Sequence, residues 1–250
     1  MGAGGRITAE AQLALRSFLR RRTAVFFTFA FPAIIVLIFG VLIQVGPAAG
    51  GLFSEPPSYY VAGYLAVVVL FTPLSRLGST VARHRDSNRF VLLAVGPMSR
   101  LEWLIAHTLV TAAIVLVAAA LLLVLVIGVT PVGLPSAAGA GLVALAVAIG
   151  AVAFGALGAL IGSLTRSTDG VIAAANALAL PLLFLSETFI PPALLPAWFA
   201  PAMALSPLTY VVRPIRLVTV EGVVDPLGLV PIAAVMLLAL IAAARVLPRL

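Results

Sequence analysis

The sequence has 250 residues and contains no lysine, no cysteine, only two histidines and only eight acidic residues. The absence of lysine excludes the phosphate-binding loop of the common ATPases, because that loop uses a lysine to contact the nucleotide phosphates. The absence of cysteine excludes disulfides and thiolate metal sites. His84 and His107 stand far apart in the sequence with no acidic cluster beside them, so no metal site is predicted. Neither the HExxH nor the GxSxG motif occurs, so no catalytic residue is predicted.

Charge is also scarce, since 9% of the residues are charged and 63% are hydrophobic. Soluble proteins carry about 25% charged residues. The uncharged runs are long, and a helix crosses the hydrocarbon core with about 20 apolar residues. The sequence therefore predicts an all-α polytopic membrane protein. The net charge of +7 comes from arginines at the edges of these runs, without interleaved aromatic residues, so no nucleic-acid partner is predicted.

Six transmembrane helices are expected, and they form a single domain over residues 23–250. The first uncharged run, 23–45, is too long for the apolar part of a signal peptide, which has about 7–15 residues, so we expect it to be a retained span. The run 103–165 is divided by the glycines and prolines between Gly128 and Pro135. The expected spans are about 23–45, 58–75, 104–128, 139–163, 170–186 and 226–244.

Residues 1–22 are expected to form an amphipathic helix that lies in the cytoplasmic membrane interface. Its predicted polar face carries Gln12, Arg16 and Arg20. Either this helix is a simple membrane anchor or it contacts a partner. The predicted apolar face consists of Ile7, Ala11, Ala14, Leu15 and Phe18.

The segment 187–225 is expected to form re-entrant or interfacial helices between spans 5 and 6, on the far side of the membrane. It contains six of the eighteen prolines, and a straight helix with this proline density would lose many backbone hydrogen bonds. Arginine sets the orientation, with thirteen of fifteen on the cytoplasmic side together with the N-terminus, and only Arg213 and Arg216 outside. A full crossing by 188–212 would also leave thirteen inside, so proline content alone favours six spans.

The only sizeable cytoplasmic loop is predicted at 76–103. It is half apolar, and a mixture of apolar residues and arginines suits docking against another protein. Alternatively, its arginines serve only as orientation signals and lipid anchors. In span 4, Gly158 and Gly162 form a close-packing motif, for which packing within the subunit is favoured over dimerisation.

Two cytoplasmic sequences, Arg85-Asp-Ser-Asn-Arg-Phe90 and Pro97-Met-Ser-Arg100, resemble the cytoplasmic loop of type-2 ABC transporter permeases. That loop has a charged Arg-Glu-x-Gly-Thr stretch followed by a Leu-rich sequence and Pro-x-Ser-Arg. Here Asp86 stands in place of glutamate, and Asn88-Arg89 in place of Gly-Thr. The far-side segment is similar as well. It contributes Pro181, Phe184, Ile190-Pro191, Leu195-Pro196 and Ser206-Pro-Leu-Thr-Tyr210.

The resemblance implies the membrane subunit of an ATP-driven exporter in the plasma membrane, which moves a drug, lipid or lipid-linked glycan. It implies a homodimeric or heterodimeric permease bound to two ATPase subunits, which bind ATP and Mg²⁺, and no cofactor on this chain. The implied coupling residues are Arg83, Arg85, Asp86, Asn88, Arg89 and Phe90, with interfacial contacts from Arg16, Arg20 and Arg21. The implied substrate path or outer gate comprises Asn176, Phe184, Glu187 and Tyr210.

Several alternatives stay open at this stage. Asn176 either makes a helix–helix hydrogen bond, the favoured interpretation, or lines a substrate path. Glu187 is either an interfacial cap or part of a gate. A secondary transporter would need ionisable residues in mid-membrane and inverted repeats, and neither is evident in the sequence. An intramembrane enzyme is the third and least favoured function.

Overall fold

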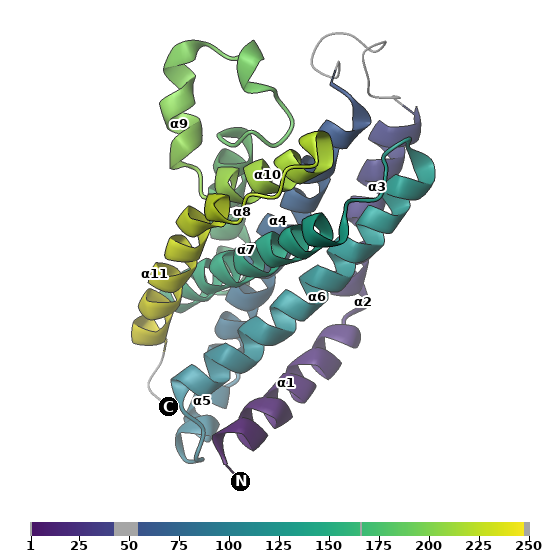
Figure 1. Cartoon of the computed structure of the whole chain (residues 1–250). Coiled ribbons are helices and arrows are strands. Elements are labelled where there is room, and N and C mark those ends of the chain that lie inside the picture. The colour runs from purple at the N-terminus through teal and green to yellow at the C-terminus, as the bar shows by residue number, and fades with distance from the viewer. Residues whose placement is uncertain (1, 43–54, 166, 248–250) are drawn as a thin grey trace.

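The computed structural model describes residues 2–42, 55–165 and 167–247, and these residues form helices and turns without any strand. The expected end of span 1 at 43–45 lies outside the described residues, as do Arg166 and Arg249, which were counted as cytoplasmic arginines. The first helix starts, and the last helix ends, at the same end of the bundle (Figure 1). We call this the terminal end, and the opposite one the far end.

The N-terminal half contains an outer helix, an interrupted first span and two 30-residue helices. π-Helical turns flank α3 and interrupt the first span, which carries Pro32. The elements are α1 (Ala3–Leu19), α2 (Arg22–Val25), η1 (Phe26–Ala30), α3 (Phe31–Leu37), η2 (Ile38–Leu42), α4 (Pro57–Asp86), α5 (Arg89–Ala94) and α6 (Arg100–Val129).

The C-terminal half contains three long helices and, between the last two, a group of short ones. The elements are α7 (Ala137–Leu164), α8 (Thr168–Phe184), the 3₁₀ turns η4 (Pro192–Leu194) and η5 (Ala197–Phe199), α9 (Ala200–Leu205), α10 (Thr209–Arg216), the π-helical η6 (Leu217–Glu221), the 3₁₀ turn η7 (Leu227–Leu229) and α11 (Val230–Val246). The segment between α8 and α11 is therefore broken into short helices, as its proline content predicts, and α9 lies at the far end (Figure 1).

Within the described residues, five helical stretches are long and apolar enough to cross a membrane. The sixth expected span corresponds to α8, which is apolar but has only 17 residues, or about 25 Å at 1.5 Å each. The hydrocarbon core is about 30 Å thick. The five stretches are Arg22–Gly40, Pro57–Asp86, Arg100–Val129, Ala137–Leu164 and Leu227–Val246.

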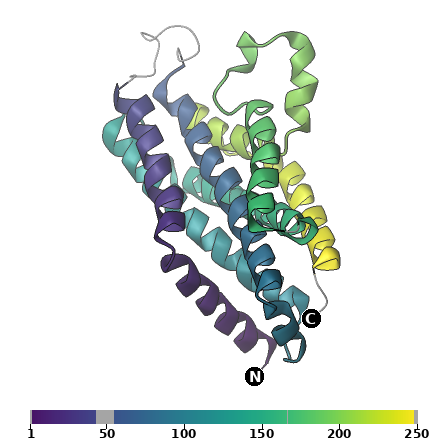
Figure 2. The same cartoon turned by 180° about the vertical axis from the view of Figure 1, so that it is seen from behind.

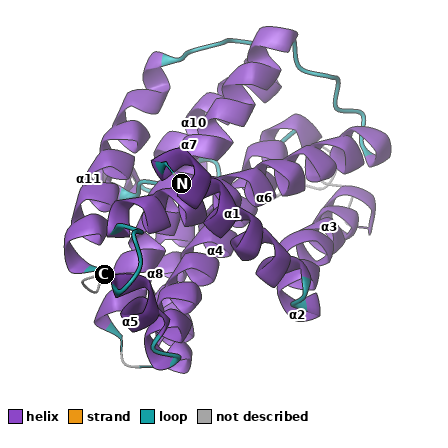
Figure 3. Ribbon diagram, turned by 90° about the horizontal axis from the view of Figure 1, so that it is seen from below, coloured by secondary structure: helices purple, strands orange, loops and turns teal. Residues whose placement is uncertain are grey.

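Helix α4 is the centre of the bundle and contacts α6, α7, α8 and α10. In the view from below it lies among its neighbours (Figure 3), and from behind α8 runs beside it (Figure 2). A Cβ added to Gly158 or Gly162 of α7 would come closer than 3 Å to backbone atoms of α4, and one added to Gly78 would lie 2.8 Å from the Gly158 carbonyl oxygen. The prediction that the two α7 glycines pack within the subunit is confirmed.

The prediction of a loop over 76–103 is wrong. Helix α4 continues to Asp86 and is about 45 Å long, so at least its last turns extend beyond a hydrocarbon core of about 30 Å. These turns stay helical because Leu77 and Val81 are fully buried on the side facing α7. Arg76 lies inside the helix, where its guanidinium donates to Thr111 and to the His107 carbonyl oxygen. The remaining non-helical residues are the turn 87–88 and the connection 95–99.

Candidate functional site

Most of the residues implicated in coupling gather at the terminal end, where α5 connects α4 to α6. The turn before α5 depends on Asn88, whose backbone is left-handed with φ of 54°. Asparagine tolerates this conformation better than most L-residues, and glycine adopts it freely. Asn88 stands where the resembling permeases carry glycine, so this departure preserves the turn.

Helix α5 has a buried face and an exposed face. Phe90 is 4% exposed, and its ring centroid lies 5.2 Å from that of Trp103 in α6. Phe90 therefore anchors α5 and is not available to a partner in this structure. Val91, Leu92 and Val95 are 63–86% exposed at and just after α5. Val91 and Leu92 are two of the apolar residues of the segment 76–103, but the sequence alone does not indicate that they form an exposed surface.

A buried polar contact at this end is made by Glu10 of α1, a residue that is not among those predicted from the sequence. The Glu10 side chain is only 4% exposed, and Nη2 of Arg89 donates to both carboxylate oxygens at 3.1 Å. Its Oε1 also lies 3.0 Å from Nε2 of the buried His107. Glu10 thus connects α1 to α5 and α6. Its spacing of four residues from Ala14, and eight from Phe18, is the signal that assigns it to the buried face.

The environment of Glu10 favours its charged form. Burial by itself raises the carboxyl pKa, but the hydrogen bond with His107 and the positive charge of Arg89 outweigh burial and bring the pKa below its ordinary value of 4.5. At neutral pH the carboxylate is therefore ionised, which is the state that binds Arg89. Glu10 itself lies in α1, outside the candidate spans.

The two histidines, which are far apart in the sequence, are close in space. Their ring centroids lie 5.5 Å apart, and Glu10 provides the acidic neighbour that the sequence did not predict for His107. In the described part of the chain, no group of three or more histidine or acidic side chains has an arrangement that could hold a metal ion.

A second contact joins α1 to α6. Arg6 pairs with Glu102, with its Nε 3.2 Å from Oε2. Glu102 also closes a capping box with Ser99, in which each backbone N–H donates to the other residue's side chain, at 2.8 and 3.2 Å. The start of α6 is thereby fixed to α1 as well as to its own cap.

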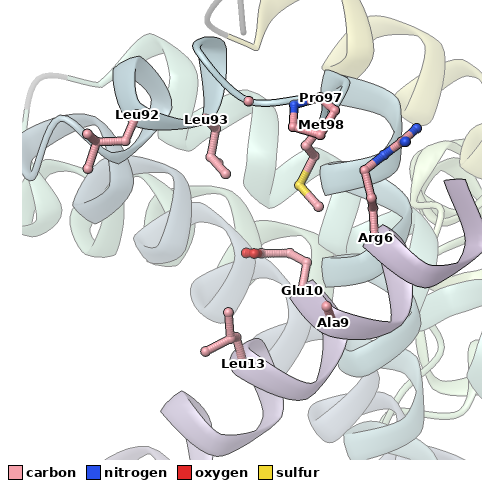
Figure 4. A pocket seen from close by; sticks show the side chains of 9 residues that line it. Arg6, Ala9, Glu10, Leu13, Leu92, Leu93, Pro97 and Met98 are labelled. Atoms are coloured by element: carbon pink, nitrogen blue, oxygen red, sulfur yellow. The ribbon is translucent and has the colours of Figure 1, made fainter. Parts of the chain in front are cut away.

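Between α1 and the α5–α6 connection lies an open cavity of about 230 Å³, shown in Figure 4. Glu10 lies between the two walls in this view, so the buried ion pair is next to the cavity. The lining residues are Arg6, Ala9, Glu10, Leu13, Leu92, Leu93, Gly96, Pro97 and Met98.

The predicted apolar face of α1 is only partly correct. Ala14 and Phe18 are buried together with Val110 and Ile114 of α6, whereas Leu15 is 41% exposed. Helix α1 therefore packs against α6, and the acidic Glu10 shares the buried face with the apolar residues. Among the described residues, Arg16, Arg20 and Arg21 are exposed and have no acidic partner.

The remaining predicted coupling residues lie at the end of α4. Arg83 donates to Oγ1 of Thr80 at 3.0 Å, within its own helix. Nη1 of Arg85 lies 3.5 Å from the Ser163 carbonyl oxygen at the end of α7. Asp86 is half exposed and its carboxylate lies 3.9 Å from Arg85. Of this group, Asp86 is the charge most open to a partner.

At the far end, Glu187 is a buried ion-pair partner for two arginines of α10. Nε of Arg213 donates to Oε1 of Glu187 at 2.8 Å, and Nη1 of Arg216 lies 3.8 Å from Oε2. The Arg216 guanidinium also lies 3.8 Å from the ring centroid of Tyr59 at the start of α4. A Cβ at Gly63 would lie 2.6 Å from the Thr188 carbonyl oxygen, so the chain after α8 crosses α4 at this glycine.

The other far-side candidates are separate from this ion pair. Asn176 and Phe184 lie eight residues apart on the exposed face of α8, and the described residues provide no hydrogen bond to the Asn176 amide. The favoured helix–helix hydrogen bond is thus not formed among the described residues. Tyr210 donates its hydroxyl to the Ala204 carbonyl oxygen at 2.9 Å.

Comparison with known families gives one match of direct importance. The family described as ABC-2 type transporter matches residues 7–219, which span α1 to η6 and include both ends described above. A comparison with curated proteins gave no match. The match covers most of the chain, and together with the apolar helices it identifies a multi-pass membrane protein. The chain belongs to the ABC-2 type transporter family and is the permease component of an ABC-type transporter.

Proposed function

We propose that this permease exports a hydrophobic or amphipathic compound, such as a drug, lipid or lipid-linked glycan, across the plasma membrane. The energy comes from ATP and Mg²⁺ bound by a separate ATPase subunit, two copies of which join a pair of permeases. The sequence itself supports a separate ATPase, because a chain without lysine lacks the common phosphate-binding loop.

One observation carries the proposal, namely the exposed apolar surface of α5. Val91, Leu92 and Val95 together present a patch that would be unfavourable in water. Phe90 and Arg89 fix this patch to α6 and α1 from behind. A surface that is apolar, exposed and rigidly attached to two helices suits docking of the ATPase and transmission of its movement.

In the proposed topology the terminal end is cytoplasmic and the chain crosses six times, with α8 as the fifth crossing and 187–225 re-entrant from the outside. The start of α1 and the end of α11 lie at the same end of the bundle, which supports an even number of crossings (Figure 1). The Glu187 ion pair holds the start of the re-entrant segment against α10.

Pairing with a second permease is proposed along α8. Its exposed face carries Ile172, Asn176, Leu180 and Phe184, spaced by four residues. An amide at membrane depth usually faces protein or water. The exposed Asn176 therefore favours the interpretation that this face contacts a second copy of the permease or lines a substrate path. Because α8 has only 17 residues, a neighbouring protein that covers it would also reduce its exposure to lipid.

The experiment is co-expression of the permease with its ATPase, followed by purification and ATP-dependent transport in vesicles. Val91→Asp and Leu92→Asp are expected to release the ATPase while the permease still inserts, because each places a charge in the proposed contact. Leu134→Asp is the matched control, since Leu134 is 81% exposed between α6 and α7, away from α5. Full ATPase retention by both α5 variants would contradict the docking assignment. Export without any ATPase subunit would contradict the function.

Topology is tested separately with single cysteines, for which the cysteine-free chain provides a clean background. A thiol reagent that cannot cross the membrane should label Trp198→Cys from outside intact cells and should not label Ser87→Cys. The reverse pattern would contradict the orientation.

A further inference from the structure

A second cavity, of about 590 Å³, lies between the start of α6 and the end of α11. We call it the α6–α11 groove. Its volume is within the roughly 300–1,000 Å³ of sites that bind small molecules. Six of its seven lining residues are apolar and the seventh is an arginine. The lining consists of Leu101, Leu104, Ile105, Leu240, Ile241, Ala244 and Arg245.

The two helices that form the groove are candidate membrane spans, and their outer faces are open. Leu101 is 57% exposed and Ile241 is 50% exposed. An exposed apolar groove on a membrane span costs no free energy of hydration, because the lipid tails around it are as apolar as its walls. We therefore expect a hydrocarbon chain of the bilayer to occupy it.

The end of the groove is positively charged. Arg245 is exposed in the last turn of α11 and, in the described part of the chain, has no acidic partner. Arg100 begins α6, and its Nη1 donates to the Leu247 carbonyl oxygen at 3.1 Å, so a second positive charge lies where the two helices come together. The acidic residue nearest in sequence, Glu102, is already bound to Arg6 and Ser99.

We propose that the α6–α11 groove binds one anionic phospholipid. An acyl chain lies between the leucines and isoleucines of the two helices, and the phosphate pairs with Arg245. Basic pockets between transmembrane helices bind anionic headgroups by this combination of charge and apolar surface. The lipid bridges α6 and α11, and so stabilises a helix pair whose only polar contact among the described residues is Arg100 with Leu247. This site requires the chain to be membrane-embedded, and it is independent of the transported substrate.

The test is native mass spectrometry of the purified full chain, titrated with phosphatidylglycerol or with phosphatidylcholine of the same acyl chains, alongside thermal unfolding. We expect one tightly bound phosphatidylglycerol per chain. Arg245→Gln should weaken the binding of phosphatidylglycerol about fivefold, which is the effect of one arginine near an anionic surface. Arg245→Lys should retain the binding. Soluble glycerol phosphate, which has no acyl chain, should not stabilise the protein.

Two further variants separate the apolar from the charged contribution. Ala244→Phe fills the groove and should abolish the tight site for either headgroup. Arg20→Gln is the matched control, because Arg20 is an exposed arginine that follows α1 and does not line the groove, and this variant should bind the lipid as the unmodified chain does. The proposal would be overturned if the two lipids bound with equal affinity, or if neither Arg245→Gln nor Ala244→Phe changed the binding of phosphatidylglycerol. A disulfide between two copies of Ile241→Cys in vesicles would instead place a second chain in the groove, and would overturn it equally.

Discussion

The ion pair between Glu10 and Arg89 allows a quantitative test of how α1 holds α5. Glu10→Ala removes the acceptor for Arg89 and leaves Nε2 of the buried His107 without its partner. Breaking a fully buried ion pair costs about 3–5 kcal/mol. Because the Arg89 side chain is 33% exposed, water screens part of the interaction, and we expect about 2–4 kcal/mol. Arg89→Ala leaves the His107 contact intact and should cost about 1–2 kcal/mol.

The measurement is thermal unfolding in detergent, followed by the fluorescence of Trp103. Trp103 lies 4.2 Å from His107 between ring centroids, and replacing Trp198 by phenylalanine leaves Trp103 as the single emitter. A chain of this size loses about 2–4 °C of melting temperature per kcal/mol. Arg16→Ala is the control, because Arg16 is exposed on α1 and should change the free energy of unfolding by less than about 0.5 kcal/mol.

The double variant decides whether the two residues act as a pair. Residues in contact show coupling energies of about 0.5–3 kcal/mol, whereas independent sites add within about 0.3–0.5 kcal/mol. We expect Glu10→Ala and Arg89→Ala together to cost at least about 1 kcal/mol less than the sum of their separate effects. Simple additivity would refute the ion pair as the connection between α1 and α5.

Four other predictions follow from single contacts. The difference in melting temperature between the unmodified chain and Glu10→Gln should shrink as the pH falls from 4.5 through the lowered pKa of the Glu10 carboxyl. Because this pKa is lowered in the folded state, the stabilisation by the carboxylate is complete above pH 4.5 and is lost when Glu10 is protonated. A difference that stays constant between pH 7 and pH 3.5 would contradict this prediction. Gly162→Leu should reduce the yield of folded protein and lower its melting temperature by overpacking α4 against α7, at a cost of about 1–3 kcal/mol or more, while Gly141→Leu, which has open space, should not. Asn88→Val should destabilise by about 1–2 kcal/mol and Asn88→Gly should not, as measured by unfolding, because only the first change opposes a φ of 54°. Arg213→Gln should increase protease cleavage within 188–206 in vesicles, since it removes a charged hydrogen bond to Glu187; unchanged cleavage would show that this contact does not hold the segment.

The sequence predicts the approximate positions of the long helices, because their cause is local, although five of the six expected spans are long enough to cross a membrane in the described residues. An uncharged run of about 20 residues is sufficient to indicate a span. The end of α4 could not be predicted in this way. The last turns of α4 carry three arginines and a histidine, which suggest a hydrated loop, but Leu77 and Val81 bury one face against α7. The packing against α7 thus outweighs the local composition. Because α7 is distant in the sequence, this packing cannot be predicted from the residues near the end of α4.

The sequence indicates which segment of the chain forms the candidate site, but it does not predict which residues contact one another there. Phe90 and Arg89 belong to the segment that the sequence indicates, but the Phe90 side chain is buried in the protein and the Arg89 side chain binds Glu10 of α1. Glu10 was missed because its partners, Arg89 and His107, are 79 and 97 residues away in the sequence. An acidic residue on an otherwise apolar stripe of a helix is the one local sign of such a partner, since burying an unpaired charge is costly.

The two connections of α5 differ in physical kind, and this has a consequence for coupling. Phe90 against Trp103 is an apolar contact, which depends little on pH or salt, whereas Arg89 with Glu10 is an ion pair that protonation of Glu10 weakens. A load applied to the exposed face of α5 therefore reaches α6 through one contact and α1 through the other. Below the Glu10 pKa only the route to α6 persists. If transmission to α1 matters for transport, acid below the lowered pKa of Glu10, and so below pH 4.5, should reduce the transport obtained per ATP to the same extent as Glu10→Gln, and acid should add nothing further to that variant.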